Sequence, residues 1–174
     1  MGEAPSPSVV ADSGPLIHLH EIGRLPLLGV VFSIVHVPHA VWDESVTGGR
    51  VPARELEVAA ALQRYQITPQ QFEQIAALPA AAGLHRGELE CLSLCQAIQA
   101  RLLLTDDLAA RHAAKLLGIQ PVGSLGVVVR AHHEGQLALP EAEDAIEKLH
   151  RVSTLFVSRA IVDMAIAQLR QPVP

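Results

Sequence analysis

The sequence predicts an α/β domain with a central, mostly parallel sheet and helices on both faces. Short apolar runs alternate along the chain with longer stretches of helical periodicity, and Gly or Pro residues separate many of them. This alternation favours parallel strands joined by right-handed crossover helices. The chain has 174 residues, 49% of them hydrophobic and only 18% charged, which is typical of a globular protein. We therefore expect residues 1–174 to form a single domain.

The first quarter of the chain predicts strand, helix, strand and helix. Residues 8–12 (SVVAD) form a short apolar run, and Pro15 suits the first turn of the helix that follows. Residues 32–37 resume β character. Pro38 then opens HAVWDESV, whose helical spacing ends at Thr47.

The middle of the chain is less regular. Pro52 opens ARELEVAAALQRY, which predicts an amphipathic helix, and a short strand is expected at 66–68. Residues 70–82, rich in Gln and Ala, predict a short helix and a loop. The stretch ELECLSLCQAIQAR predicts a helix, because its side chains recur at helical spacing at Leu89, Leu92, Cys95, Ile98 and Gln99.

The second half predicts two more strand–helix units and two final helices. The expected elements are a strand at 102–105, a helix to Leu117, a strand at 119–123 (IQPVG), a helix at 124–135, and helices at 140–150 and 158–169, the last with Ser158 as its N-cap. The helices within 140–174 would cover the sheet or pair with another subunit, so we expect a homo-oligomer, most simply a dimer.

Composition and the chain start exclude several classes of protein. The longest apolar stretch, residues 25–37, is interrupted by polar residues and is shorter than the roughly 20 residues of a membrane span. The start MGEAPSPS lacks the basic and apolar regions of a signal peptide, so we expect a cytoplasmic protein with a flexible segment at 1–7. A net charge of -5 argues against a pure nucleic-acid-binding module.

Zinc and nucleotide sites are not indicated. Cys91 and Cys95 lie four residues apart in a predicted helix, which favours small core residues on one face. Their spacing lacks the paired ligands of a structural zinc site, and the nine histidines are scattered. Neither GxxxxGK[ST] nor GxGxxG occurs in the sequence.

The most informative stretch is LLLTDDLAAR, where a buried strand ends in two carboxylates. Ligands of open α/β sheets bind at the carboxyl ends of strands, which is where Asp106 and Asp107 are expected. One of them is explained as the N-cap of the helix LAARHAAKLLG. Two adjacent acids are more than a cap requires, and their repulsion is relieved by a cation.

Acids also occur at three other expected strand ends or helix starts. Asp12 follows the first strand, and it is explained equally well as a helix cap or as a ligand. Glu44 and Glu88 lie near the beginnings of expected helices, and the helix dipole alone favours acids in a first turn. Together the four positions indicate a site for Mg²⁺ or Mn²⁺, which take carboxylate oxygens and can clamp a phosphodiester.

The chain resembles the PIN-domain family of metal-dependent nucleases, and in particular small prokaryotic members similar to the toxin ribonucleases of toxin–antitoxin pairs. The resemblance covers about residues 9–137, and it rests on the segments VVADSGPLIHL, VPHAVWDE, GELECLSL, LLLTDDLAAR and GSLGVVVRAHHEG. It implies a three-layer PIN-like domain in which distant acids converge at the carboxyl edge of the sheet to hold one or two Mg²⁺ or Mn²⁺ ions.

Carried over by position, the resemblance implies the ligands Asp12, Glu44, Glu88 and one of Asp106 and Asp107. Many members have Asp at the third position, so Glu88 departs from the commonest form, although the subgroup pattern does use GE there.

The resemblance also assigns supporting roles. The family's T-x-D spacing favours Asp107 as the ligand, with Asp106 as a cap or supporting residue. Ser13 matches a small hydroxyl residue that the family often places near the metal. For Arg111, one helical turn after the acid pair, we expect an ion pair with Asp106 or Asp107 rather than a phosphate contact.

The implied function is a metal-dependent endoribonuclease acting on single-stranded RNA, with an antitoxin protein as a partner if it belongs to a toxin–antitoxin pair. A PIN-fold nucleic-acid-binding or regulatory scaffold with little cleavage is the alternative. The sequence opposes two phosphate-transferring α/β classes. A dehalogenase-like phosphatase would have Asp-x-Asp where this chain has Asp12-Ser13-Gly14, and a receiver domain would have a late lysine where it has Gly123-Ser124.

Overall fold

The computed structural model describes residues 7–171 and contains a five-stranded sheet in which every pair of neighbouring strands is parallel. The strand order is β3-β2-β1-β4-β5. The strands are β1 Val9–Ala11, β2 Val35–Pro38, β3 Leu62–Tyr65, β4 Leu102–Leu104 and β5 Gln120–Val122. The predicted α/β class with a parallel sheet is confirmed.

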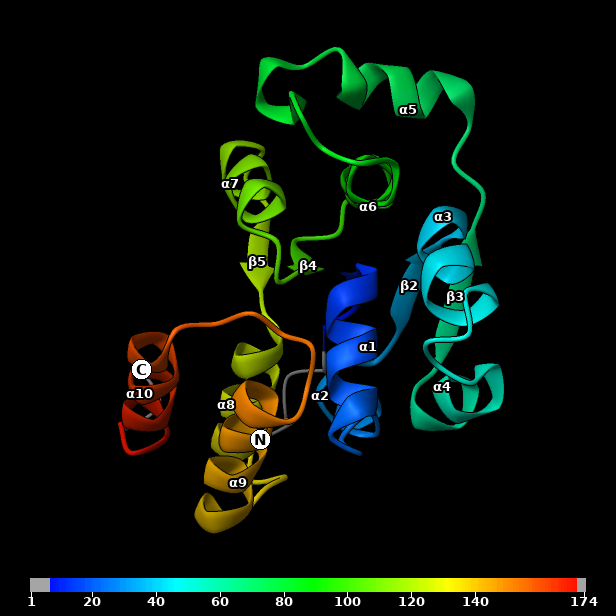
Figure 1. Cartoon of the computed structure of the whole chain (residues 1–174). Coiled ribbons are helices and arrows are strands. Elements are labelled where there is room, and N and C mark those ends of the chain that lie inside the picture. The colour runs from blue at the N-terminus through cyan, green and yellow to red at the C-terminus, as the bar shows by residue number, and fades with distance from the viewer. Residues whose placement is uncertain (1–6, 172–174) are drawn as a thin grey trace, which may run out of the picture.

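Helices cover both faces of this sheet and complete three layers (Figure 1). They are α1 Ser13–Glu21, α2 Leu27–Val31, α3 His39–Trp42, the π-helix η1 Asp43–Thr47, α4 Ala53–Ala59, α5 Pro69–Ala76, the 3-10 helix η2 Pro79–Ala81, α6 Arg86–Ala97, α7 Leu108–Leu116, α8 Ser124–His133, α9 Leu139–Arg151 and α10 Arg159–Leu169. Helices α5, α6 and α7 lie on one side, and α1, α2 and α8 lie on the other, with α9 and α10 packed against α8.

The two central strands have entirely buried side chains because helices cover them from both sides. All three residues of β1 and of β4 are buried, as expected for continuous aliphatic runs in a parallel sheet. The cysteines of α6 are free and buried, as predicted, and burial raises the pKa of Cys91 well above its ordinary value and that of Cys95 to about 12. These thiols are core residues.

The prediction for residues 53–68 is wrong in its boundaries. The stretch ARELEVAAALQRY was expected to be one helix, with a strand at 66–68, but the helix α4 ends at Ala59 and the strand is β3. All four residues of β3 pair with β2, from Val35↔Leu62 to Pro38↔Tyr65. This pairing outweighs the helical propensity of the segment. The short helix α2 was also not predicted.

Two further expectations concern the ends of the chain and membranes. Apart from Pro7, the segment at 1–7 for which flexibility was predicted lies outside the described residues. The predicted helices at 140–150 and 158–169 are present as α9 and α10, and Ser158 caps α10 with its side chain. Across residues 7–171, no helix has both the length and the apolar character needed to cross a membrane.

The strand order determines where a crevice opens. After β1 the chain continues through α1 to β2 on one side, whereas β4 lies on the other side of β1 and leads into α7. The segments that follow β1 and β4 therefore leave for opposite faces of the sheet (Figure 1). Such a switch point at the carboxyl edge is where open α/β sheets bind ligands.

Candidate active site

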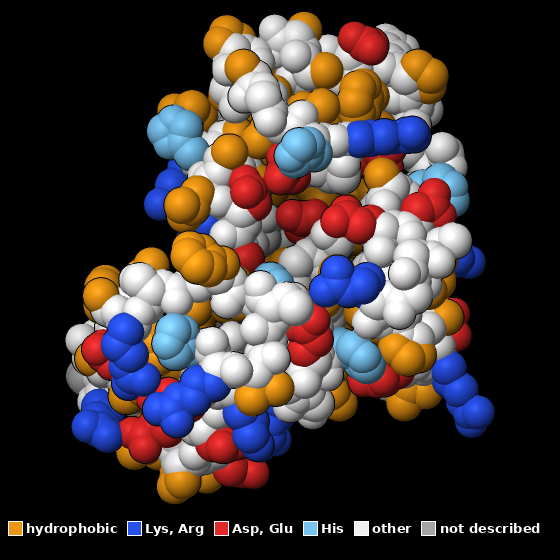
Figure 2. Space-filling view, in the orientation of Figure 1, with side chains coloured by type: hydrophobic (Ala, Val, Ile, Leu, Met, Phe, Trp, Pro, Cys, Tyr) orange, Lys and Arg blue, Asp and Glu red, His pale blue; other side chains and the backbone are white. Residues whose placement is uncertain are grey.

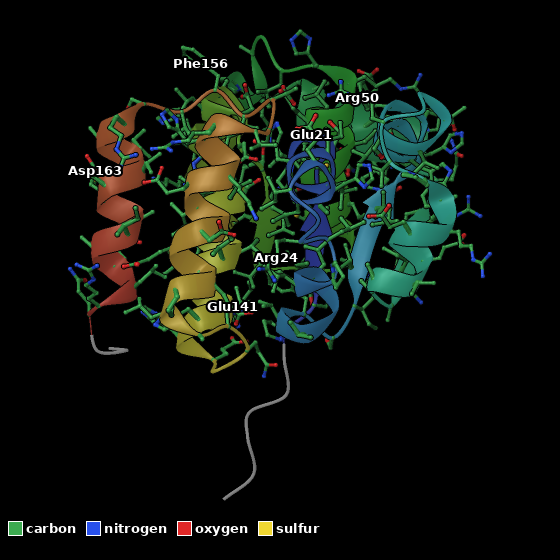
Figure 3. The ribbon with its side chains drawn as sticks, turned by 60° about the horizontal axis from the view of Figure 1, so that its bottom comes forward. Glu21, Arg24, Arg50, Glu141, Phe156 and Asp163 are labelled. Atoms are coloured by element: carbon green, nitrogen blue, oxygen red, sulfur yellow. The ribbon has the colours of Figure 1, made fainter. Side chains whose placement is uncertain are left out.

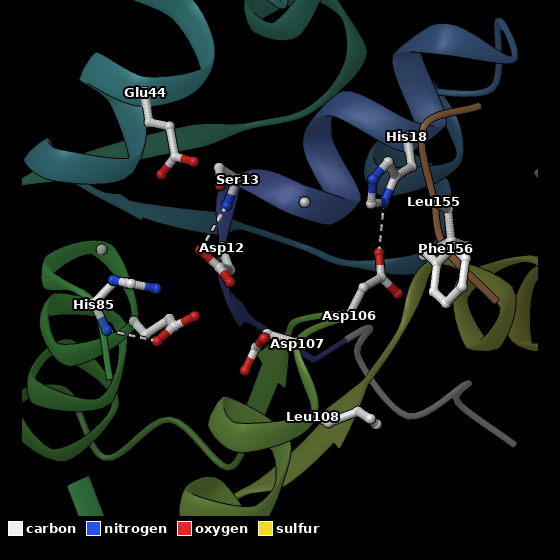
Figure 4. Close-up of a pocket in the computed structure, with 13 residues that line it drawn as sticks. Asp12, Ser13, His18, Glu44, His85, Asp106, Asp107, Leu108, Leu155 and Phe156 are labelled. Atoms are coloured by element: carbon white, nitrogen blue, oxygen red, sulfur yellow. Dashed lines mark hydrogen bonds and ion pairs between the residues drawn. The ribbon is translucent and has the colours of Figure 1, made fainter. Parts of the chain in front are cut away.

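All five candidate acids line one cavity of about 490 Å³ at this switch point, which we call the acidic cavity. Asp12 follows β1, Asp106 and Asp107 follow β4, Glu44 lies in η1, and Glu88 lies in the first turn of α6. Figure 2 shows red acidic side chains gathered in a hollow on this face of the molecule, and Figure 4 shows the cavity at close range. The structure thus brings together acids from four distant segments of the chain.

Asp12 is the acid most affected by its surroundings. Its Oδ1 accepts a hydrogen bond from the backbone N–H of Ser13 at 2.8 Å, and its Oδ2 accepts one from the hydroxyl of Thr105 at 3.0 Å. The side chain is nevertheless buried, and burial raises the pKa of Asp12 to about 6, with the charges of Glu88 and Glu44 acting in the same direction. Ser13, expected near the metal, is buried and also lines the cavity.

Glu88 and Glu44 face the cavity from two other elements. Oε2 of Glu88 accepts a hydrogen bond from the backbone N–H of His85 at 2.7 Å. Burial raises the pKa of Glu88, and the charges of Asp107 and Glu44 add to this effect. Oε2 of Glu44 lies over the start of α6, 3.5 Å from the place that a Cβ would occupy on Gly87.

A buried carboxylate in α6 holds the segment that carries Glu44. Oε2 of Glu90 accepts a hydrogen bond from the backbone N–H of Ala40 at 3.0 Å, and its Oε1 accepts one from Arg86 at 2.9 Å. The hydrogen bond from Ala40 joins the start of α3 to α6, and the contact with Arg86 lies within α6. The chain then widens into the π-helix η1, a type of irregularity that is frequent at functional sites.

The two adjacent acids after β4 have different partners. Oδ1 of Asp107 accepts from the backbone N–H of Ala110 at 2.8 Å, so Asp107 is the N-cap of α7. Both oxygens of Asp106 are occupied, Oδ1 by the N–H of Ser124 at 2.7 Å and Oδ2 by the Ser124 hydroxyl at 2.5 Å and by Nδ1 of His18 at 2.8 Å. The cap is therefore Asp107 and not Asp106, which instead ties α1 to the start of α8.

The prediction that Arg111 forms an ion pair with Asp106 or Asp107 is wrong: no such pair is present within residues 7–171. NH1 of Arg111 donates to the carbonyl oxygen of Thr105 at 3.1 Å, and the hydrogen bonds of Asp106 already come from Ser124 and His18. A glycine allows this close arrangement, because a Cβ on Gly123 would lie only 2.7 Å from Oδ1 of Asp106. Arg111 thus supports the turn after β4.

The sequence did not indicate several other residues that line the acidic cavity. They are His18, His85, Leu108, Leu155 and Phe156. His18 is a polar residue between Ile17 and Leu19 in α1, and this interruption of an apolar run is the sequence feature that could have indicated it. The apolar residues belong to loops and helix starts, where their proximity to the acids depends on the tertiary fold.

The donor set fits a hard divalent cation, because neighbouring carboxylates raise the pKa of Asp12 and of Glu88, and positive charge would relieve this repulsion. Within residues 7–171, no group of three or more His, Cys, Asp or Glu side chains is arranged to hold a metal ion.

A parallel sheet whose switch point gathers acids from distant segments is the arrangement that the sequence resemblance implies. The family model described as a PIN domain matches residues 8–171, so the chain belongs to the PIN-domain family. The match confirms the resemblance seen in the sequence and extends it through α10. Proteins of this fold generally act as nucleases and typically use divalent metal ions. A comparison with curated proteins finds no match.

Proposed function

We propose that this protein is a divalent-metal-dependent endoribonuclease that hydrolyses phosphodiester bonds in single-stranded RNA. The observation that carries the proposal is that Asp12, Glu44, Glu88 and Asp107 all line one cavity at the carboxyl edge of the sheet. Four carboxylates in one cavity are costly for the fold alone, and they suit an ion that bridges protein and phosphate oxygens.

In this proposal the four carboxylates hold Mg²⁺ or Mn²⁺. Asp106 does not bind the ion but positions the site, because it is hydrogen-bonded to His18 and to the start of α8. The bound ion supplies Lewis-acid stabilisation of the phosphate and lowers the pKa of water. Asp107 is the better ligand of the adjacent pair. Among the described residues one oxygen of Asp107 accepts a hydrogen bond, whereas both oxygens of Asp106 do.

The toxin role, an antitoxin partner and a dimer are finer parts of the same proposal. The toxin role and the antitoxin are supported by the sequence resemblance. Exposed apolar residues on α10, Ile161 and Met164, support a protein contact at this helix. Co-purification with the product of a neighbouring gene tests the antitoxin, and the mass of the purified protein in solution tests the dimer.

A PIN-fold scaffold that binds nucleic acid with little cleavage is the second candidate. It is favoured by the absence of Lys and Arg among the described residues that line the acidic cavity, and by the carboxylates not being arranged for an ion. A cleavage assay separates the two candidates.

The experiment compares RNA cleavage with Mg²⁺, with Mn²⁺ and with EDTA for the wild type, Asp12→Asn and Asp43→Asn. Asp43 is the matched control, because it is an exposed acid that neighbours Glu44 but does not line the cavity. We expect the wild type and Asp43→Asn to cleave only with metal, and Asp12→Asn to be inactive while folded. Cleavage by Asp12→Asn at the wild-type rate would contradict the proposed site, and an inactive wild type would favour the scaffold.

A further inference from the structure

Phe156 is a fully exposed aromatic side chain at the edge of the acidic cavity. Its relative exposure is 103%, whereas Phe32 is buried and Phe72 packs against the core. Phe156 and its neighbour Leu155 line the same cavity as the acids, as Figure 4 shows. The fold gains no burial from this ring, and its place beside the acids leaves one face free for a ligand of the cavity.

The loop that presents Phe156 is anchored on both sides of the ring. The backbone N–H of Thr154 donates to Oε2 of Glu21 at 2.7 Å, and its hydroxyl lies 3.0 Å from both carboxylate oxygens. Leu155 and Val157 pack against the core, so the residue between them points outward. Figure 3 shows Phe156 projecting from this loop, with Glu21 on the adjacent helix.

The anchor is ionic as well as geometric. NH2 of Arg50 lies 3.3 Å from Oε1 of Glu21 and 3.4 Å from the hydroxyl of Thr154. Partial burial acts to raise the pKa of Glu21, but the hydrogen bonds from Thr154 and Arg50 outweigh it and the pKa is lowered. The carboxylate is therefore charged at neutral pH, and it anchors the backbone of Thr154.

The surroundings of the ring limit what can bind it. No Lys or Arg of residues 7–171 lines the cavity, and the chain carries a net charge of -5, so cationic side chains supply little affinity for a phosphate backbone there. A protein segment that covered Phe156 would also cover the neighbouring carboxylates and bury them, which is costly. A nucleobase instead needs only one flat apolar face, and every base offers one.

We propose that Phe156 stacks on a nucleobase next to the phosphodiester bond held in the acidic cavity, and so selects unpaired strands. The inference rests on the proposed function for the position of the phosphodiester. In a duplex the bases are stacked on one another, so only a single strand or a loop offers a free face to the ring. Phe156 is then a specificity-determining residue, while the acids carry the chemistry.

The test measures binding and cleavage for four proteins: the wild type, Phe156→Ala, Phe156→Trp and Val58→Ala. Val58 is the matched control, because it is an apolar side chain that is 80% exposed on α4, away from the cavity. The probes are a fluorescein-labelled single-stranded RNA of mixed sequence and the same RNA as a duplex. Binding is measured with Ca²⁺ and cleavage with Mn²⁺, and melting temperatures confirm that each variant is folded.

We expect Phe156→Ala to weaken single-strand binding by about tenfold or more and to raise KM similarly, with a smaller effect on kcat. Phe156→Trp should restore binding, Val58→Ala should match the wild type, and the duplex should bind weakly to all four. Unchanged binding and KM in Phe156→Ala, with an active wild type, would overturn the stacking role and leave the nuclease intact.

Other outcomes separate the two proposals. A wild type that binds single strands through Phe156 but does not cleave them would keep the stacking role and overturn the nuclease. A wild type that neither binds nor cleaves RNA would overturn both. A change of solution mass in Phe156→Ala with unchanged RNA affinity would assign the ring to contact between copies of the chain.

Discussion

Replacing Asp12 by asparagine measures the electrostatic cost of the acidic cavity. The pKa of Asp12 is raised from 3.8 to about 6, chiefly by burial. This is a difference of about 2 units, and at about 1.4 kcal/mol each it corresponds to about 3 kcal/mol. The folded state binds the proton of Asp12 more tightly than the unfolded state does. The resulting contribution to the free energy of unfolding is fully present below about pH 4 and is lost as the pH rises through about 6.

Asp12→Asn should therefore be more stable than the wild type at alkaline pH without metal. Asparagine keeps an oxygen that accepts from the N–H of Ser13 but removes the buried charge. Allowing for a weaker contact with Thr105, we expect a gain of about 1–3 kcal/mol at about pH 8 in EDTA, or about 2–4 °C in Tm for each kcal/mol. The gain should shrink toward zero as the pH falls to about 4.

Thermal melts over this pH range, in EDTA and with Mn²⁺, make the measurement. Mn²⁺ should raise the Tm of the wild type, because an ion that binds only the folded state stabilises it, and should not raise that of Asp12→Asn. Asp43→Asn, which removes an exposed acid outside the cavity, should follow the wild type. A loss of more than about 1 kcal/mol by Asp12→Asn at alkaline pH would refute the reasoning and make Asp12 a structural cap.

Two other substitutions test the site and the fold. Asp107→Asn should abolish both cleavage and the Mn²⁺-dependent rise in Tm, whereas Asp106→Asn should keep the rise in Tm and lose about 10- to 100-fold in activity; the reverse pattern would make Asp106 the ligand. Gly29→Ala should cost about 1–3 kcal/mol in chemical denaturation, because its Cβ would lie 2.2 Å from the carbonyl oxygen of Ala59; a cost below about 0.5 kcal/mol would show that α2 and α4 separate easily.

The sequence predicted strands close to β1, β2, β4 and β5, but it placed the third strand after β3 and missed the short helix α2. The strands β1 and β4 are recognisable because every side chain is buried. The edge strand β3 has partly exposed residues, and its sequence LQRY continues a helical pattern, so only its pairing with β2 identifies it. Parallel pairing joins segments far apart in the chain, and local periodicity does not report it.

The acids of the site could be predicted because they follow strands or open helices, and these points meet at one edge of the sheet. Their partners could not be predicted. The contact between Asp106 and His18 joins residues 88 positions apart, and the position of Phe156 depends on the packing of α9 against α8 and on the bond from Thr154 to Glu21. Such contacts follow from the tertiary fold alone.

The acids have structural partners as well as a place in the cavity. One oxygen of Asp12, of Asp107 and of Glu88 accepts a backbone N–H at the start of α1, α7 and α6, respectively, and the second oxygen of Asp12 accepts from the hydroxyl of Thr105. Three helix N-termini thus meet at the cavity, and their partial positive charges offset part of the repulsion among the acids. The fold can therefore keep these carboxylates in one cavity without an ion. An electrostatic cost remains, because the pKa of Asp12 is raised, and a divalent cation would relieve that cost.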